Sequence, residues 1–226
     1  NKENNEWACD DFRLTDGQPL TIGLDFTATK ATYERDLSIG KATLCLPYEL
    51  PVQGFNAYTL SEKQGNADAL RFMPVTNKLE AYKPYLLMAD GTVQLGGENI
   101  EVKAFNDDKL TTPAGKYSFV GTVTGMDNAS ATAANAYILQ DDGKFHKVTT
   151  EHSEAMLPYR AYIQRNDSGA KQLSVVLDGE TTGIGSTTNE ATDGKNGPVY
   201  DLQGRRVADR LDDATRHRLP AGVYIV

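Results

Sequence analysis

The chain has 226 residues, of which 39% are hydrophobic and 24% are charged, and its formal net charge at pH 7 is −8. This composition excludes an intrinsically disordered chain, because enough apolar residues are present to form a core. The negative charge argues against nucleic acids and anionic membranes as partners, since both require a basic protein surface. No apolar run approaches the roughly 20 residues that a membrane-spanning helix needs, so we expect no membrane span.

Residues 1–19 precede the long strand patterns and are treated as an N-terminal segment. They show no signal peptide, but their polar start resembles an interdomain boundary, so its absence is no argument for the cytoplasm. Cys9 lies in this segment, and Cys45 lies in the apolar run 42–47. Two interpretations stay open. The cysteines form a disulfide in an oxidising compartment, or Cys45 is a buried free thiol that acts as a small hydrophobic residue.

Apolar and polar residues alternate with a period of two along much of residues 20–178. Successive side chains of a strand point to opposite faces, so each alternating run predicts a strand that buries one face. Turn sequences rich in Asp, Asn and Gly separate these runs at short intervals. The pattern predicts an antiparallel β-sandwich or jelly-roll-like body over residues 20–178. The clearest runs are 20–27, 100–104, 117–123 and 173–177.

Two short segments of the body depart from this alternation. Residues 150–156 are the only stretch with a helical pattern, and the pattern there is weak. The small-residue run 128–135 is predicted to be a loop, because it has no apolar stripe that would hold a helix against the core.

The composition changes near the end of the body. Residues 179–197 are rich in Gly, Thr, Ser and Asn and offer little to bury, which predicts a linker. Residues 198–226 show a second strand pattern, in which Gln203 and Gly204 would turn the chain between the first two strands. We therefore predict an all-β protein with a sandwich-like body and a small C-terminal β domain.

The C-terminal region resembles the sorting domains of secreted proteins in Bacteroidetes-type bacteria. The resemblance rests on Val-Tyr-Asp-Leu-Gln-Gly-Arg-Arg-Val at 199–207 and Leu-Pro-Ala-Gly-Val-Tyr-Ile-Val at 219–226. It implies a small β-sandwich that a type IX secretion system recognises for export and surface attachment. The family pattern continues with a turn and a basic strand, so residues 198–226 are expected to be a truncated form. The residues that match the sorting motif are Tyr200, Asp201, Gly204, Arg205, Gly222 and Tyr224.

The body also resembles modules that lie upstream of such C-terminal domains. The matching segments 28–35, 41–48, 81–87 and 157–163 occur in the same order. Such modules are found beside leucine-rich repeats and other adhesive domains. The resemblance therefore implies a location outside the cytoplasm, secreted or at the cell surface, and names no activity.

We find no sequence pattern that favours catalysis or metal binding. Cys45 lies between leucines, where burial raises the pKa of a thiol and disfavours a reactive thiolate. His146 and His152 lack a known ligand spacing. The pairs Asp107-Asp108 and Asp141-Asp142 follow no calcium-loop pattern, and we interpret them as solvated turns. We expect no catalytic residues, metal or cofactor and leave the ligand-binding residues unassigned.

Aromatic residues cluster around a loop that contains Pro and Gly. Tyr48, Phe55 and Tyr58 would form an exposed patch there if they faced solvent. The favoured interpretation is that they pack between sheets, with their hydroxyl groups reaching the rim, because aromatic residues are common in strands.

These observations favour a non-catalytic binding or adhesion module. Its partners would be an extracellular glycan or protein and, through the C-terminal region, a secretion machinery. A second hypothesis is the accessory C-terminal region of a larger secreted hydrolase. A third is an enzyme in its own right, which would require a cleft with two close carboxylates, one of them with a raised pKa.

Overall fold

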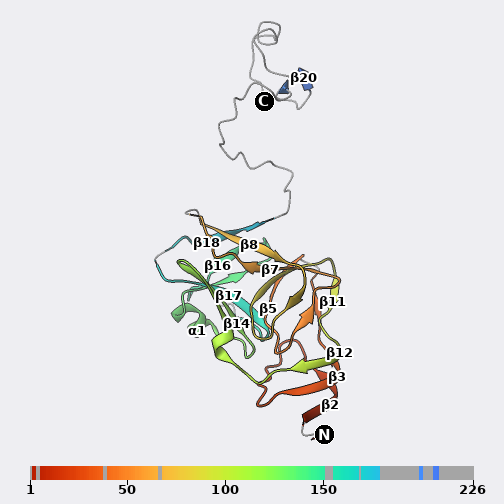
Figure 1. Cartoon of the computed structure of the whole chain (residues 1–226). Helices are drawn as coiled ribbons and strands as arrows, with labels where there is room; N and C mark the ends of the chain where they lie inside the picture. The colour runs from red at the N-terminus through yellow and green to blue at the C-terminus, as the bar shows by residue number, and fades with distance from the viewer. Residues whose placement is uncertain are drawn as a thin grey trace. The chain divides into compact units, whose positions relative to one another are not determined.

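The computed structural model describes residues 2–3, 6–37, 40–65, 68–150, 155–167 and 169–178 and the strands Val199–Tyr200 and Arg206–Ala208. The chain forms two compact units, Asn1–Glu180 and Thr181–Val226. Strands dominate these residues, which include one α-helix, α1 (Asn128–Ala133), and one 3-10 helix, η1 (Asp107–Lys109) (Figure 1). None of the described helices has the length and apolar character that a bilayer crossing requires. The predicted all-β, sandwich-like fold is confirmed.

The first unit is built around a ten-stranded sheet. Its neighbouring strands are antiparallel except for the β18–β8 pair, which is parallel. In order across the sheet, the strands are β13 (Thr111–Ala114), β14 (Tyr117–Thr122), β17 (Arg160–Arg165), β15 (Ala136–Leu139), β16 (Phe145–Lys147), β18 (Gln172–Leu177), β8 (Ala69–Val75), β7 (Asn56–Leu60), β10 (Tyr85–Met88) and β5 (Lys41–Leu44).

This sheet curls until its last strand, β5, faces β17, the third strand in the order. Two hydrogen bonds join them: the Cys45 amide donates to the Tyr159 carbonyl at 3.2 Å, and the Ala161 amide donates to Thr43 Oγ1 at 2.9 Å. One of these bonds uses a side chain, so β5 and β17 do not continue a regular ladder. The curl encloses a core of apolar and aromatic side chains that includes Phe72, Phe119 and Phe145.

A second, four-stranded sheet packs a separate core in the same unit. Its strands, in order, are β1 (Lys2–Glu3), β2 (Glu6–Arg13), β3 (Phe26–Thr32) and β12 (Gly97–Val102). β2 runs parallel to β3, and Phe12 and Leu14 are buried, so residues before 20 contribute to this core. Three short pairs complete the described strands: β4 (Glu34–Asp36) with β11 (Thr92–Gln94), β6 (Leu50–Pro51) with β9 (Lys78–Leu79), and β19 (Val199–Tyr200) with β20 (Arg206–Ala208).

Two local predictions differ from the structure. Residues 20–25 are not a strand, although they alternate, because only Ile22 is buried there while Leu20 and Leu24 are exposed. The loop predicted at 128–135 is wrong, because α1 covers Asn128–Ala133. The Asp127 side chain caps this helix by accepting a hydrogen bond from the Ser130 amide at 2.7 Å, and Ala131 is fully buried. A helix of six residues needs only one buried side chain, so its sequence contains no apolar stripe by which it could be predicted.

The weak helical pattern at 150–156 is only partly covered by described residues. Of those, Met156 forms an antiparallel bridge with Met126 instead of a helical turn. Residues 151–154 lie outside the described residues.

Candidate functional site

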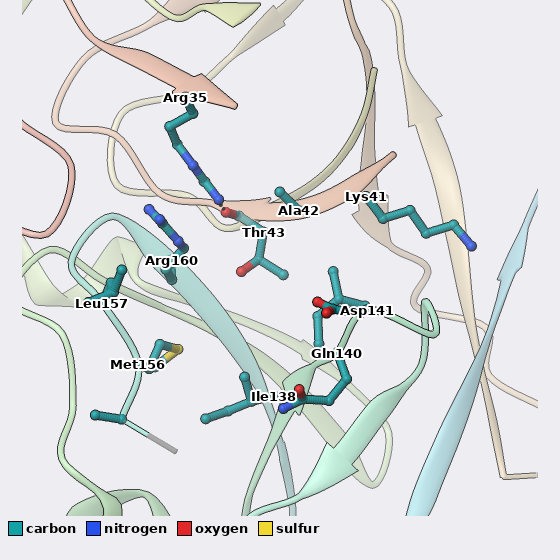
Figure 2. Close-up of a pocket in the computed structure, with 12 residues that line it drawn as sticks. Arg35, Lys41, Ala42, Thr43, Ile138, Gln140, Asp141, Met156, Leu157 and Arg160 are labelled. Atoms are coloured by element: carbon teal, nitrogen blue, oxygen red, sulfur yellow. Dashed lines mark hydrogen bonds between the residues drawn. The ribbon is translucent and has the colours of Figure 1, made fainter. Parts of the chain in front are cut away.

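A pocket of about 260 Å³ opens where β5 faces the start of β17. Three further segments contribute to its wall: β4, the turn between β15 and β16, and the residues just before β17 (Figure 2). We call this cavity the arginine pocket, after two of its side chains, Arg35 and Arg160. The lining residues are Arg35, Lys41, Ala42, Thr43, Ile138, Leu139, Gln140, Asp141, Ala155, Met156, Leu157 and Arg160.

The period-two pattern of a strand places Arg35 inside the protein. Tyr33, Arg35 and Leu37 are buried, whereas Glu34 and Asp36 between them are exposed. Arg35 is only 7% exposed, and its Nη1 donates a hydrogen bond to the Thr43 carbonyl oxygen of β5 at 2.6 Å. β4 therefore carries a guanidinium group into the gap beside β5, where an apolar side chain would be expected.

Arg160 is held from the opposite side of the gap, at the first residue of β17. Its guanidinium lies 2.9 Å from Asp16 and donates to the Tyr33 hydroxyl at 3.0 Å and the Pro158 carbonyl at 3.1 Å. The Tyr33 hydroxyl in turn donates to Asp16 at 2.8 Å. Three partners, Asp16, Tyr33 and Pro158, thus fix the orientation of Arg160 before any ligand binds.

The turn into β17 is fixed by Tyr159. This residue adopts the left-handed region, with a φ of 60°, although it is not glycine. Its hydroxyl donates to the Gln18 carbonyl at 2.8 Å, and its ring packs edge-on against Tyr33. These contacts offset the backbone strain of a bulky residue at positive φ, and they aim Arg160 toward Arg35.

The two guanidinium groups lie near one carboxylate, that of Asp16, which forms an ion pair with Arg160. Burial and, to a smaller extent, the nearby charge of Arg160 together lower the pKa of Arg35 to about 10, so Arg35 remains charged at neutral pH. Burial alone would raise the pKa of Asp16, but the hydrogen bond from Tyr33 and the charge of Arg160 outweigh it and lower that pKa. Asp16 is therefore ionised and engaged with Arg160. Within the described part of the chain, Arg35 has no carboxylate within 4.0 Å.

The rest of the pocket has a different chemistry. On the other side of Thr43 from the arginines, Figure 2 shows Gln140 and Asp141 at the β15–β16 turn. Ile138 and Met156 supply an apolar part of the wall. The Lys41 ammonium group points away from the arginines, so Lys41 adds positive charge at the rim and does not join the pair (Figure 2). The pocket thus has a cationic wall, an acceptor-bearing wall and an apolar patch.

Of the two acidic pairs, Asp141-Asp142 occupies a turn, as predicted, whereas Asp107-Asp108 lies in a 3-10 helix. Asp141 lines the arginine pocket, and its neighbour Asp142 faces His146, with 2.9 Å between its Oδ2 and Nε2 of the histidine. Asp107 and Asp108 form η1, which Asn106 caps. Among the residues the structure describes, no three His, Cys, Asp or Glu side chains gather where they could hold one metal ion.

The alternative of an exposed aromatic patch is wrong. Tyr48, Phe55 and Tyr58 are all buried, as the favoured interpretation expected. The Tyr48 hydroxyl donates to the Leu95 carbonyl, and the Tyr82 hydroxyl donates to the Lys103 carbonyl at 2.7 Å. These rings build the core and offer no stacking platform.

Both cysteines are free thiols in the structure. Cys45 is fully buried, and burial raises the pKa of its thiol far above the ordinary value, as predicted. A Cβ at Gly121 of β14 would lie 2.5 Å from Cys45 Sγ. Cys45 therefore fills the tight contact between β14 and the end of β5.

The residues that match the sorting motif lie almost entirely outside the described residues. Tyr200 is the exception, because it belongs to β19, which pairs with β20 in an antiparallel hairpin. The other five, and the predicted linker at 179–197, are not described: Asp201, Gly204, Arg205, Gly222 and Tyr224. Their role in sorting stays a prediction.

None of the family models, curated proteins or solved structures compared with this chain matches it. The functional argument therefore rests on the geometry of the arginine pocket and on the sequence patterns.

Proposed function

We propose that this chain is a non-catalytic binding module, secreted or displayed at the cell surface, that holds an acidic group of its ligand between Arg35 and Arg160. The observation that carries the proposal is a pair of neighbouring guanidinium groups of which, among the described residues, only Arg160 has a carboxylate partner. One of the pair is more than nine-tenths buried and lines an open pocket.

A ligand carboxylate would remove the charge imbalance of the arginine pocket. A buried charge is unfavourable unless it is paired, and Arg35 has only the Thr43 carbonyl as a hydrogen-bond partner among the described residues. Guanidinium groups bind carboxylates through two parallel hydrogen bonds, which are about twice as strong as bonds between neutral groups. Asp16 and Tyr33 hold Arg160 in place, so little side-chain entropy is lost on binding.

In this proposal the second unit, Thr181–Val226, serves secretion or anchoring rather than binding. Support comes from the two motifs at 199–207 and 219–226. Fusing the second unit to a reporter tests this part, and unchanged export and attachment after its deletion would contradict it.

Acetate is the simplest probe of the arginine pocket. A ligand that binds only the folded state raises the melting temperature by an amount that grows with the logarithm of the ratio of its concentration to its dissociation constant. At constant ionic strength, we expect acetate to stabilise the wild-type chain and to bind the Arg160→Gln variant about tenfold more weakly or worse, because the bidentate pair is lost. The acetate affinity of Arg160→Lys should lie between these two, since lysine keeps the positive charge but cannot form two parallel hydrogen bonds with a carboxylate.

Arg13→Gln is the matched control for this experiment. It also removes one positive charge, but Arg13 is exposed and forms its ion pair with Asp11, away from the arginine pocket. Equal acetate affinities in the wild-type chain and both Arg160 variants would exclude the arginine pocket as the binding site.

A further inference from the structure

The size of the arginine pocket limits what its ligand can be. Small-molecule sites usually measure about 300 to 1,000 Å³, and this pocket, at about 260 Å³, lies just below that range. It therefore accommodates one sugar ring or one side chain, and the remainder of a larger ligand would stay outside.

The two walls of the pocket are complementary to a ligand that carries a carboxylate on one side and hydrogen-bond donors on the other. The arginines favour one carboxylate, as proposed above. Asp141 makes no hydrogen bond or ion pair with the described residues, and its carboxylate lies on the other side of Thr43 from the arginines (Figure 2). A carboxylate accepts hydrogen bonds and repels a second negative charge. The matching ligand group has hydroxyl donors on the side away from its own carboxylate.

The net charge of the chain favours a ligand with a single carboxylate over a polyanion. The pocket lining carries three positive side chains, Arg35, Lys41 and Arg160, and one negative side chain, Asp141. The chain as a whole carries −8. A densely charged partner, such as a heavily sulfated polymer or a run of acidic residues, would be attracted by one small area and repelled by the rest. An isolated carboxylate among neutral groups avoids that repulsion.

We infer that the arginine pocket binds a uronic acid residue of an extracellular polysaccharide, with the carboxylate on Arg35 and Arg160 and ring hydroxyls donating to Asp141. The inference rests on the proposed function and narrows it to one ligand class. A hexuronate has one carboxylate, several hydroxyl groups and an apolar ring face, which corresponds to the three parts of the wall. An acidic side chain of a peptide has the carboxylate but lacks the hydroxyls.

The test compares four probes by calorimetry or NMR titration: methyl glucuronoside, methyl glucoside, acetate and a blocked glutamate, N-acetylglutamate methylamide. We expect the glucuronoside to bind about tenfold more tightly than acetate, because its ring hydroxyls add hydrogen bonds to Asp141 that acetate cannot make. The neutral glucoside should show no binding. Asp141→Asn should reduce the affinity for the glucuronoside several-fold and leave that for acetate unchanged or higher.

Glu98→Gln is the matched control, because it also neutralises one exposed carboxylate but lies on β12 in the other sheet. A glucuronoside that binds no better than acetate, or an Asp141→Asn variant that weakens both equally, would overturn this inference and leave the proposed function standing. If the blocked glutamate bound more tightly than the glucuronoside, the ligand would be an acidic peptide rather than a glycan. Absence of binding by every acidic probe would overturn both proposals.

Discussion

Replacing Phe72 with alanine should lower the free energy of unfolding by about 4 kcal/mol, which is a large part of the stability of a typical domain. Phe72 lies on β8 and is fully buried inside the curl of the ten-stranded sheet. Its ring packs edge-on against Phe119 at 5.4 Å between centroids and is stacked with Phe145 at 6.2 Å. Alanine would leave a cavity between strands that come from distant parts of the sequence.

Met73→Ala is the natural control for this prediction. Met73 is the next residue of the same strand, points to the opposite face and is 45% exposed. We expect its loss to change the free energy of unfolding by less than about 1 kcal/mol. Denaturant titrations of the two variants give both values. Similar losses at the two positions would contradict the assignment of the faces of β8.

Replacing Gly96 with alanine should cost about 3 kcal/mol or prevent folding, because the added methyl group has no room. A Cβ at Gly96 would overlap the Ala31 carbonyl oxygen and lie 2.8 Å from its carbon. These are backbone atoms of β3, so they cannot rotate away as the end of a side chain would. Relief requires β3 and β12 to move apart at the point where their pairing begins.

Gly23→Ala provides the comparison for Gly96. A Cβ at Gly23 meets nothing within 4 Å, and the residue does not have a positive φ. Alanine there should be neutral or stabilise by up to about 1 kcal/mol, because it reduces the entropy of the unfolded chain. Melting temperatures of the Gly96→Ala and Gly23→Ala variants, each compared with the wild-type chain, test this prediction. An unchanged Gly96→Ala protein would show that β3 and β12 are not in close contact.

The fold class could be predicted from the sequence because period-two alternation is a local signal. β12, β14 and β18 coincide with predicted runs and bury the expected faces. Residues 20–25 show the limit of that signal, since alternation without a neighbouring strand to pair with does not produce a strand. The helix α1 shows another limit, because its one strong signal was the capping residue Asp127 rather than an apolar stripe.

The arginine pocket could not be assembled from the sequence. Arg35 lies on β4, which pairs with β11, and Arg160 lies on β17 of the ten-stranded sheet. They come together because β4 packs beside β5 and β5 faces β17, contacts between strands far apart in the chain. A partial signal did exist. Arg35 occupies the inward position between Tyr33 and Leu37, and a charged residue in an otherwise apolar face indicates a functional or paired side chain.

The most direct test of the arginine pocket is an NMR titration with acetate that follows the Nε–Hε signals of the arginines. We expect the signals of Arg35 and Arg160 to shift together and to saturate with one dissociation constant. The signals of Arg13 and Arg71, which are exposed and pair with Asp11 and Asp178, should remain in place. Small, unsaturated shifts of equal size at all arginines would contradict the claim that this pocket binds an acidic group.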